Sequence, residues 1–143
     1  MRSLGLDVGD RKIGVAISDP QGILAIPLTT IKIKDESAAI ADIAKLAEQY
    51  EVERIVVGLP YSLDGSLGQQ AEKIRAFTEK LSLRAKRSNL RQIDIQLWDE
   101  RLSSVAAERL MVEAGTKRDK RKQHLDAMAA AFILQGFLDS LRA

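Results

Sequence analysis

The stretch SLGLDVGDRKIGVAIS, residues 3–18, decides how the fold begins. Two short runs rich in Leu, Ile and Val, Ser3 to Asp7 and Lys12 to Ser18, are joined by Gly9-Asp10-Arg11. Apolar, β-branched runs that are separated by Gly and Asp are typical of two strands and a turn. The stretch therefore predicts a β-hairpin.

A third extended run follows the hairpin, and a helical pattern follows that run. Ile23 to Ile33 keeps the apolar character of a strand. Apolar residues then recur at helical spacing as far as Tyr50, behind Asp35 or Ser37 as the residue that caps the helix. We therefore expect three antiparallel strands and then a first helix.

The rest of the chain alternates strands and helices. A run of antiparallel strands followed by such alternation is typical of a mixed sheet with helices on its faces. The predicted fold class is α/β, with a five-stranded mixed sheet, antiparallel at its start and parallel later, flanked by about four helices. The later elements are expected as a strand at Arg54 to Leu59, a helix containing Ala71, Ile74 and Phe77, a strand at Ile93 to Trp98, a helix from Ser103 or Ser104 to Gly115, and a last helix from about Gln123 to Leu141.

The composition is that of an ordinary folded protein. Residues 1–143 fit one domain, in which 45% of the residues are apolar and 29% are charged. The absence of cysteine excludes disulfides, thiolate zinc sites and a cysteine nucleophile. Asp7 interrupts the apolar stretch that a signal peptide would need, and no apolar run is long enough to span a bilayer. We therefore expect a cytoplasmic protein with no membrane partner.

Three carboxylates stand at unusual places in this pattern. Asp7 lies inside an apolar strand, Glu100 follows the last strand, and Asp126 stands at the head of an alanine-rich helix. An unpaired carboxylate loses its hydration on burial and must then be neutralised, paired or bound to a cation. Gly5 and Gly9 share the face of Asp7 and would leave room beside it for a cation or a phosphate.

If the three carboxylates meet, their mutual repulsion favours a divalent cation. Oxygen-only ligands indicate one or two Mg²⁺ or Mn²⁺ ions rather than zinc, and such a site suits metal-assisted phosphodiester hydrolysis. Asp7, Glu100 and Asp126 are therefore the candidate catalytic and metal-binding residues. Simpler roles stay open: Asp7 could cap a turn or pair with Arg11, Glu100 could be merely solvated, and Asp126 could cap its helix.

Positive charge is concentrated near these acids, although the formal net charge is only +2. Lys117-Arg118-Asp119-Lys120-Arg121-Lys122 directly precedes the helix of Asp126. Lysine and arginine release condensed counterions when they meet phosphates, so this run predicts a nucleic-acid partner, with a solvated loop as the alternative. No P-loop or dinucleotide motif is present, and we expect no nucleotide cofactor. A second basic group is expected to be plain solvated surface; it comprises Arg84, Lys86, Arg87 and Arg91.

Four motifs follow one another along nearly the whole chain. They are Gly5-Leu6-Asp7-Val8-Gly9 with Arg11, Ile13-Gly14-Val15-Ala16 and Ser18-Asp19; Ile55-Val56-Val57-Gly58-Leu59-Pro60 with Asp64-Gly65; Asp99-Glu100-Arg101-Leu102; and Leu125-Asp126 with Ala129-Ala130 and Ile133-Leu134. In this order they resemble the YqgF-type, Holliday-junction-resolvase-like family of pre-16S rRNA nucleases. The stretch from Leu83 to Leu90 looks like an insertion relative to that family.

The resemblance implies a ribonuclease H-like fold and assigns the catalytic role to Asp7, Glu100 and Asp126. It implies a nuclease for structured nucleic acid that processes the 5′ end of precursor 16S rRNA, in association with the ribosome or its precursors. Related nucleases often carry a fourth carboxylate on the last helix, and Gln123, Ala129 and Ala130 do not supply one. One of two metal ions would then be held weakly.

In this hypothesis a set of basic residues binds the nucleic acid. They are Arg11, Lys12, Arg101, Lys117, Arg118, Lys120, Arg121 and Lys122. The alternatives are a module that binds RNA or a Holliday junction without cutting it, and a DNA junction resolvase acting on branched DNA. A fragment of an actin-like or sugar-kinase-like ATPase is a further alternative, because Asp7-Val8-Gly9 also resembles a phosphate loop of that fold, but 143 residues are too few for its two domains. A monomer and a homodimer are both compatible with the sequence.

Overall fold

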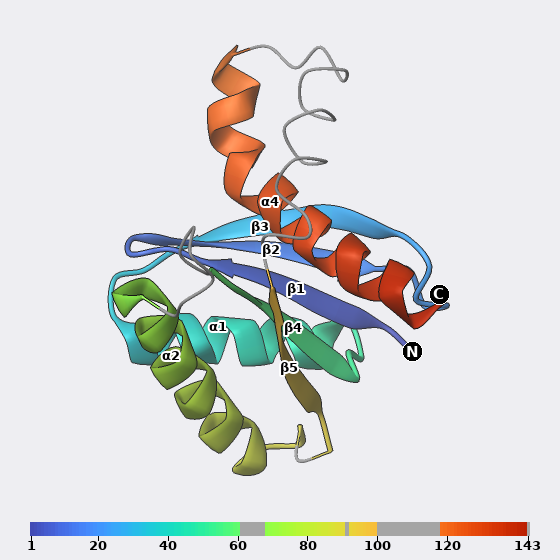
Figure 1. Ribbon diagram of the computed structural model, residues 1–143. Coiled ribbons are helices and arrows are strands. Elements are labelled where there is room, and N and C mark those ends of the chain that lie inside the picture. Colours follow the sequence, from blue (N-terminus) through green and yellow to red (C-terminus); the bar gives the residue numbers. More distant parts are fainter. Residues whose placement is uncertain (61–67, 91, 100–117, 143) are drawn as a thin grey trace.

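The chain forms a five-stranded sheet with helices on both faces (Figure 1). The computed structural model describes residues 1–60, 68–90, 92–99 and 118–142, and within 118–125 it describes the backbone alone. The strands lie in the order β3-β2-β1-β4-β5. Their bounds are β1 (Ser3–Val8), β2 (Lys12–Ser18), β3 (Ala25–Lys32), β4 (Arg54–Leu59) and β5 (Asp94–Asp99).

The sheet contains both antiparallel and parallel strand pairs. β1 and β2 form the predicted antiparallel hairpin, and β3 continues it as an antiparallel neighbour of β2, with a register shift between Val15 and Ala16. β4 runs parallel to β1, and β5 runs parallel to β4. The predicted mixed sheet, antiparallel at its start and parallel later, is confirmed.

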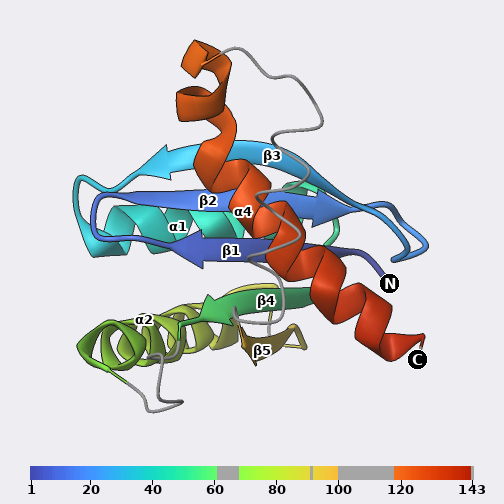
Figure 2. The same ribbon diagram turned by 45° about the horizontal axis from the view of Figure 1, so that its top comes forward.

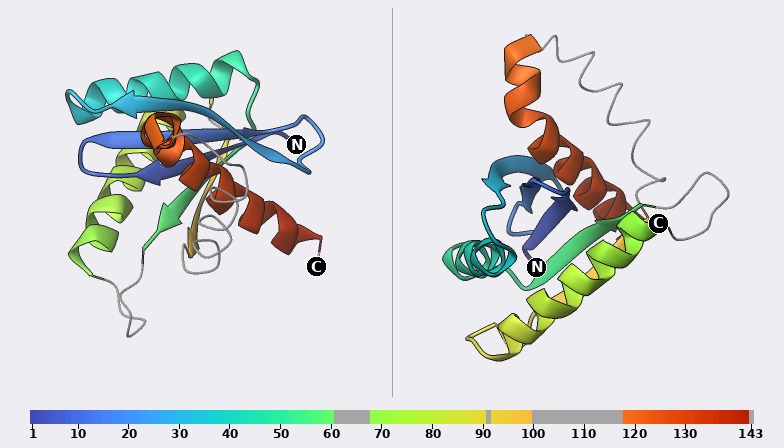
Figure 3. Two further views of the ribbon diagram at one scale, coloured as in Figure 1. Left: turned by 90° about the horizontal axis from the view of Figure 1, so that it is seen from above. Right: turned by 90° about the vertical axis from the view of Figure 1, so that its left-hand side faces the viewer.

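Two helices cover one face of the sheet and one crosses the other. α1 (Glu36–Gln49) and α2 (Gln69–Lys86) lie on one side, and α4 (Arg118–Leu141) runs diagonally over the opposite side (Figures 2 and 3). The Asp35 carboxylate accepts a hydrogen bond from the Ala38 N–H at 2.8 Å, so the predicted cap of α1 is confirmed. No helix among these described residues combines the length and the apolarity needed to cross a bilayer.

The two faces of the sheet have cores of different composition. Leu4, Leu6 and Val8 alternate toward α1 and α2, where most of the buried side chains are large aliphatic ones. The α4 side has small residues at the contact, such as Ala16 and Ala130. Because small side chains allow close approach, α4 packs with its backbone near the strands.

α4 begins at Arg118, five residues before the expected start at Gln123. Lys, Arg and Gln are good helix formers, and neither Gly nor Pro separates this basic run from the alanine-rich segment. Residues 118–122 are therefore helical, and the prediction that this basic run precedes the helix was wrong. The first turns of α4 stand away from the sheet (Figure 1).

Two further expectations concern the helices. The described residues contain three helices, fewer than the expected four or so, and the helix expected from Ser103 or Ser104 to Gly115 falls outside the described ranges. The stretch from Leu83 to Leu90 contains the last turn of α2, and Leu90 packs into the core. That this stretch is an insertion relative to the family stays a prediction.

Asp19 organises the turn that connects β2 to β3. Its carboxylate accepts hydrogen bonds from the N–H groups of Ile23 at 2.7 Å, Leu24 at 2.8 Å and Gln21 at 3.3 Å. These backbone donors, that of Leu24 first, hold the pKa of Asp19 below its ordinary value despite partial desolvation. The ionised form of Asp19 therefore stabilises the turn.

We expect the stabilisation by Asp19 to disappear in acid. A carboxyl whose pKa is lower in the folded than in the unfolded chain stabilises the fold above its unfolded pKa of about 3.9 and loses that effect as the pH falls through the folded value. Asp19→Asn should therefore melt at a lower temperature than wild type at pH 6, and the difference should shrink below about pH 4. Thermal melts followed by circular dichroism between pH 3 and 7 measure this.

The matched control for Asp19 is Asp42→Asn. Asp42 is an exposed aspartate of α1 for which no hydrogen bond is found in the described part of the chain. This variant should follow wild type at every pH. A melting difference for Asp19→Asn that is constant from pH 3 to 7 would contradict the role given to its charge.

Candidate functional site

Asp7 lies near the end of β1, on the face of the sheet that α4 covers. It is half-buried and is paired in register with Gly14 of β2, and Thr30 of β3 pairs with Gly14 in turn. On the other side, the β1–β4 register extended by one residue places Gly58 next to Asp7. Since both neighbours in this row are glycines, no side chain of β2 or β4 stands directly beside Asp7.

At Gly14 the backbone of α4 lies directly against β2. A Cβ atom built on Gly14 would lie 1.8 Å from the carbonyl oxygen of Asp126 and 2.2 Å from its carbonyl carbon. Directly paired residues in antiparallel strands have Cα atoms about 4.5–5.5 Å apart. The backbone of Asp126, which rests on Gly14, therefore lies close to the paired residues Gly14 and Asp7. Two of the three candidate acids, from opposite ends of the chain, thus belong to neighbouring segments.

Gly5 has a different role from the one expected. A Cβ atom at Gly5 would lie 2.7 Å from the Cβ of Leu134 and 2.8 Å from the carbonyl oxygen of Ala130. The space beside Gly5 is therefore filled by α4, and it does not leave room for a cation or a phosphate. The missing side chain lets the helix approach, which in turn sets the position of Asp126.

Asp126 does not stand at the head of its helix. It lies eight residues after Arg118, the first residue of α4, and is half-buried. Helix-dipole and capping effects act within the first turn, so they do not explain a carboxylate at this depth. The expected capping role of Asp126 was wrong, because the basic residues before it extend the helix.

A polar clamp fixes where α4 lies along the sheet. The Gln135 side chain accepts a hydrogen bond from the Ala25 N–H at 2.9 Å and donates one to the Ile23 carbonyl oxygen at 3.0 Å. Ile23 belongs to the β2–β3 connection that Asp19 organises, and Ala25 is the first residue of β3. The turn, the clamp and the two glycine contacts together determine the position of Asp126 over β2.

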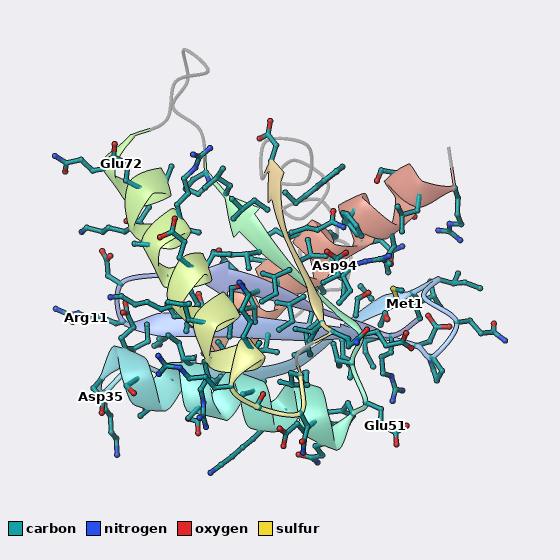
Figure 4. All side chains as sticks on the ribbon, turned by 90° about the horizontal axis from the view of Figure 1, so that it is seen from below. Met1, Arg11, Asp35, Glu51, Glu72 and Asp94 are labelled. Atoms are coloured by element: carbon teal, nitrogen blue, oxygen red, sulfur yellow. The ribbon has the colours of Figure 1, made fainter. Side chains whose placement is uncertain are left out.

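The other predicted site residues are placed only in part. Arg11 and Lys12 are exposed at the β1–β2 end of the sheet, and Figure 4 shows Arg11 at that end. Glu100, Arg101 and Lys117 lie outside the described residues. Within the described residues, no three His, Cys, Asp or Glu side chains group closely enough to hold a metal ion. Four basic residues are placed by their backbone in the first turns of α4, and they are Arg118, Lys120, Arg121 and Lys122.

Two features of the site were missed from the sequence. The Thr30 hydroxyl lies in the Gly14 and Asp7 row and is buried without a hydrogen-bond partner. Trp98 of β5 packs edge-on against Phe137 of α4, with ring centroids 5.6 Å apart. Nothing in the sequence around Thr30 distinguishes it from other residues of an ordinary strand. The single tryptophan, Trp98, directly precedes Asp99 and Glu100, and this position could have indicated a contact near the site.

The chain is similar to proteins of one family along nearly its whole length. Residues 1–140 match the family model described as RuvX: Holliday junction resolvase. A Clostridium botulinum (strain Hall) protein with the provisional name of pre-16S rRNA nuclease is 50% identical over 141 residues, covering 99% of this chain and 98% of the relative.

Solved structures show the same architecture at low identity. T. thermophilus RuvC in complex with a Holliday junction substrate aligns with a TM-score of 0.65 and 18% identity, covering 100% of this chain and 96% of that chain. The fowlpox virus resolvase in complex with Holliday junction DNA aligns with a TM-score of 0.60 and 13% identity over 100% of both chains. The fold is therefore the ribonuclease H-like fold of these resolvases.

Proposed function

This chain belongs to the RuvX family of Holliday-junction-resolvase-like nucleases, and from that premise we propose that it is a divalent-metal-dependent nuclease that processes the 5′ end of precursor 16S rRNA. The family is the one that the four sequence motifs indicated. Relatives half identical to this chain over nearly its full length carry the pre-16S rRNA nuclease name, which favours RNA as the substrate. The proposal places the protein in the cytoplasm with pre-ribosomal RNA, as one domain.

The contact of Asp126 with Gly14 is the observation that carries this proposal. It places the backbone of Asp126 against Gly14, the register partner of Asp7, and both aspartates are half-buried residues. Two like charges in a partly dehydrated site repel each other, and a divalent cation removes that repulsion. Acidic residues of distant segments that lie close together are a typical arrangement for binding a divalent cation.

The donor set fits Mg²⁺ or Mn²⁺. Asp7 and Asp126 offer carboxylate oxygens, which these hard cations prefer, and the chain has no cysteine for a softer metal. Glu100, directly after β5 and outside the described residues, is the proposed third ligand. When bound, such an ion lowers the pKa of a water nucleophile and stabilises the leaving oxygen.

The basic residues have a separate part in the proposal. Arg11 and Lys12 are exposed at the β1–β2 turn, close along the chain to Asp7, where their charge attracts backbone phosphates. Arg101 and the basic residues of 117–122 are proposed to do the same. The scissile phosphate would then be held near Asp7 and Asp126.

A cleavage assay on three substrates tests the proposed function. The substrates are an RNA spanning the precursor 16S rRNA 5′ end, a four-way DNA junction and a linear DNA duplex, each with Mg²⁺, Mn²⁺ or EDTA. We expect the RNA to be cut in either metal and none of the substrates to be cut in EDTA. Binding without cutting of any substrate in either metal would overturn the proposal and establish a non-cleaving binding module.

Junction resolution is the second candidate function. The family description names a Holliday junction resolvase, and this favours branched DNA independently of the names of the relatives. In the same assay, cutting of the four-way junction with the RNA left intact would establish this function instead. The linear duplex is the control, because general endonuclease activity would cut it as well.

A further inference from the structure

Two adjoining hollows form a groove between α1 and α2, on the opposite side of the sheet from α4. Their volumes are about 310 and 580 Å³, and Glu36 and Lys80 line both. We call this the α1–α2 groove. It begins at Gly9 and Asp10 in the β1–β2 turn and ends at Arg84 and Arg87. In Figure 4, α1 and α2 face the viewer, and Arg11 and Asp35 lie at the same end of the molecule as Glu72 of α2.

One wall of the groove is a stripe of positive charge along α2. Lys73, Lys80, Arg84 and Arg87 line it at intervals of seven, four and three residues, which keeps them on one side of the helix. All four side chains are exposed. At 1.5 Å per residue the stripe is about 21 Å long. A stripe of lysine and arginine along one helix is a typical footprint for a nucleic-acid backbone.

The acidic residues in the groove are largely engaged. The Asp35 carboxylate caps α1 through the Ala38 N–H, and the Glu36 carboxylate pairs with Lys80 at 2.5 Å. Asp10 lies at the turn end, away from the arginines. No ion pair of Lys73, Arg84 or Arg87 is present among the described residues. Three cationic side chains therefore remain available to an anionic ligand.

The groove begins at the β1–β2 turn, close along the chain to Asp7 of the proposed site, although Asp7 lies on the opposite face of the sheet. Gly9 is two residues from Asp7, and strand geometry makes this separation about 7 Å. We propose that the α1–α2 groove binds the phosphate backbone of the single-stranded RNA that flanks the cleavage point. The Glu36–Lys80 ion pair links α1 to α2 across the groove. This inference rests on the proposed function for the identity of the strand.

Two charge-matched triple variants of the full chain test the groove. The groove variant carries Lys73→Gln, Arg84→Gln and Arg87→Gln. The control variant carries Lys45→Gln, Arg75→Gln and Lys86→Gln, which are exposed basic residues of the same two helices outside the groove. Each lowers the net charge by three. Binding of a labelled 20-nucleotide oligouridylate is measured by fluorescence anisotropy in EDTA at several salt concentrations.

The groove variant should bind the oligouridylate about tenfold more weakly than wild type at 0.1 M salt. Its slope of log K against log salt should fall in magnitude by about 2, since each lost contact with a single strand removes roughly 0.7. The control variant should change the dissociation constant less than twofold. Equal weakening by the two variants, or no weakening by the groove variant, would overturn the inference.

A cleavage measurement separates this inference from the proposed function. For a precursor RNA with a 20-nucleotide flank, the groove variant should raise KM about tenfold and leave kcat unchanged. With the flank cut to four nucleotides, the groove variant should match wild type. If wild type cuts no RNA, the proposed function fails, and the anisotropy experiment still decides whether the groove binds a strand.

Discussion

Replacing Asp7 by asparagine will abolish metal-dependent cleavage and leave the chain folded. Asp7 is half-buried beside the segment of β2 on which Asp126 rests, and asparagine keeps its shape while removing its charge. Loss of a ligand to a catalytic metal removes several kcal/mol of transition-state stabilisation, which corresponds to a fall in kcat of about 10³-fold or more. Single-turnover cleavage of the precursor RNA measures this.

Metal binding itself gives a second measurement for Asp7. A ligand that binds only the folded chain stabilises it by about 2.7 kcal/mol at one hundred times its dissociation constant, which raises the Tm of a domain of this size by roughly 5–10 °C. Mn²⁺ should therefore raise the Tm of wild type and have little effect on Asp7→Asn.

The matched control for Asp7 is Asp10→Asn. Asp10 is an exposed aspartate in the turn of the same hairpin, and its loss should leave both cleavage and the Mn²⁺-induced stabilisation close to wild type. If Asp7→Asn cuts at the wild-type rate, Asp7 is not part of the mechanism. If Mn²⁺ stabilises both proteins equally, the ion binds elsewhere.

The parts of the fold that could be predicted are those governed by local pattern. The hairpin over residues 3–18, the cap at Asp35 and the strand from Arg54 to Leu59 follow from period-two alternation, turn chemistry and capping, which act over a few residues. The start of α4 was missed because the alanine-rich segment was taken as the whole helix. The helix-forming residues before it extend the helix to Arg118.

The parts of the site that could not be predicted depend on contacts between distant segments. The carboxylate of Asp7 was conspicuous because it breaks an apolar strand. The role of Gly14 could not be predicted, because it depends on a contact with α4, a helix that begins about a hundred residues later in the chain. Gly5 was misinterpreted for the same reason: sequence alone shows that space is created beside a strand but not which element occupies it.

The second large effect is expected from Gly14→Ala, the smallest side chain that can be added there. The new Cβ atom would lie 1.8 Å from the carbonyl oxygen of Asp126, and both atoms belong to or adjoin the main chain, so no side-chain rotation can relieve the contact. α4 must move away from β2. Overpacking of this kind costs about 1–3 kcal/mol or more. A displacement of about 1 Å at a catalytic group can lower the rate by about 10²-fold.

We therefore expect Gly14→Ala to lower cleavage about 100-fold at a temperature where circular dichroism shows the protein folded, and to lower the Tm. Gly5→Ala and Gly9→Ala are compared with it, because an added Cβ atom at these positions would be less crowded than at Gly14. A Cβ at Gly5 would lie 2.7 Å from Leu134, farther along α4, and a Cβ at Gly9 would lie 3.0 Å from the Lys12 carbonyl oxygen within the turn. The loss of cleavage should fall in the order Gly14, Gly5, Gly9. Wild-type cleavage by folded Gly14→Ala would show that the close seating of Asp126 on β2 is not what positions the catalytic acids.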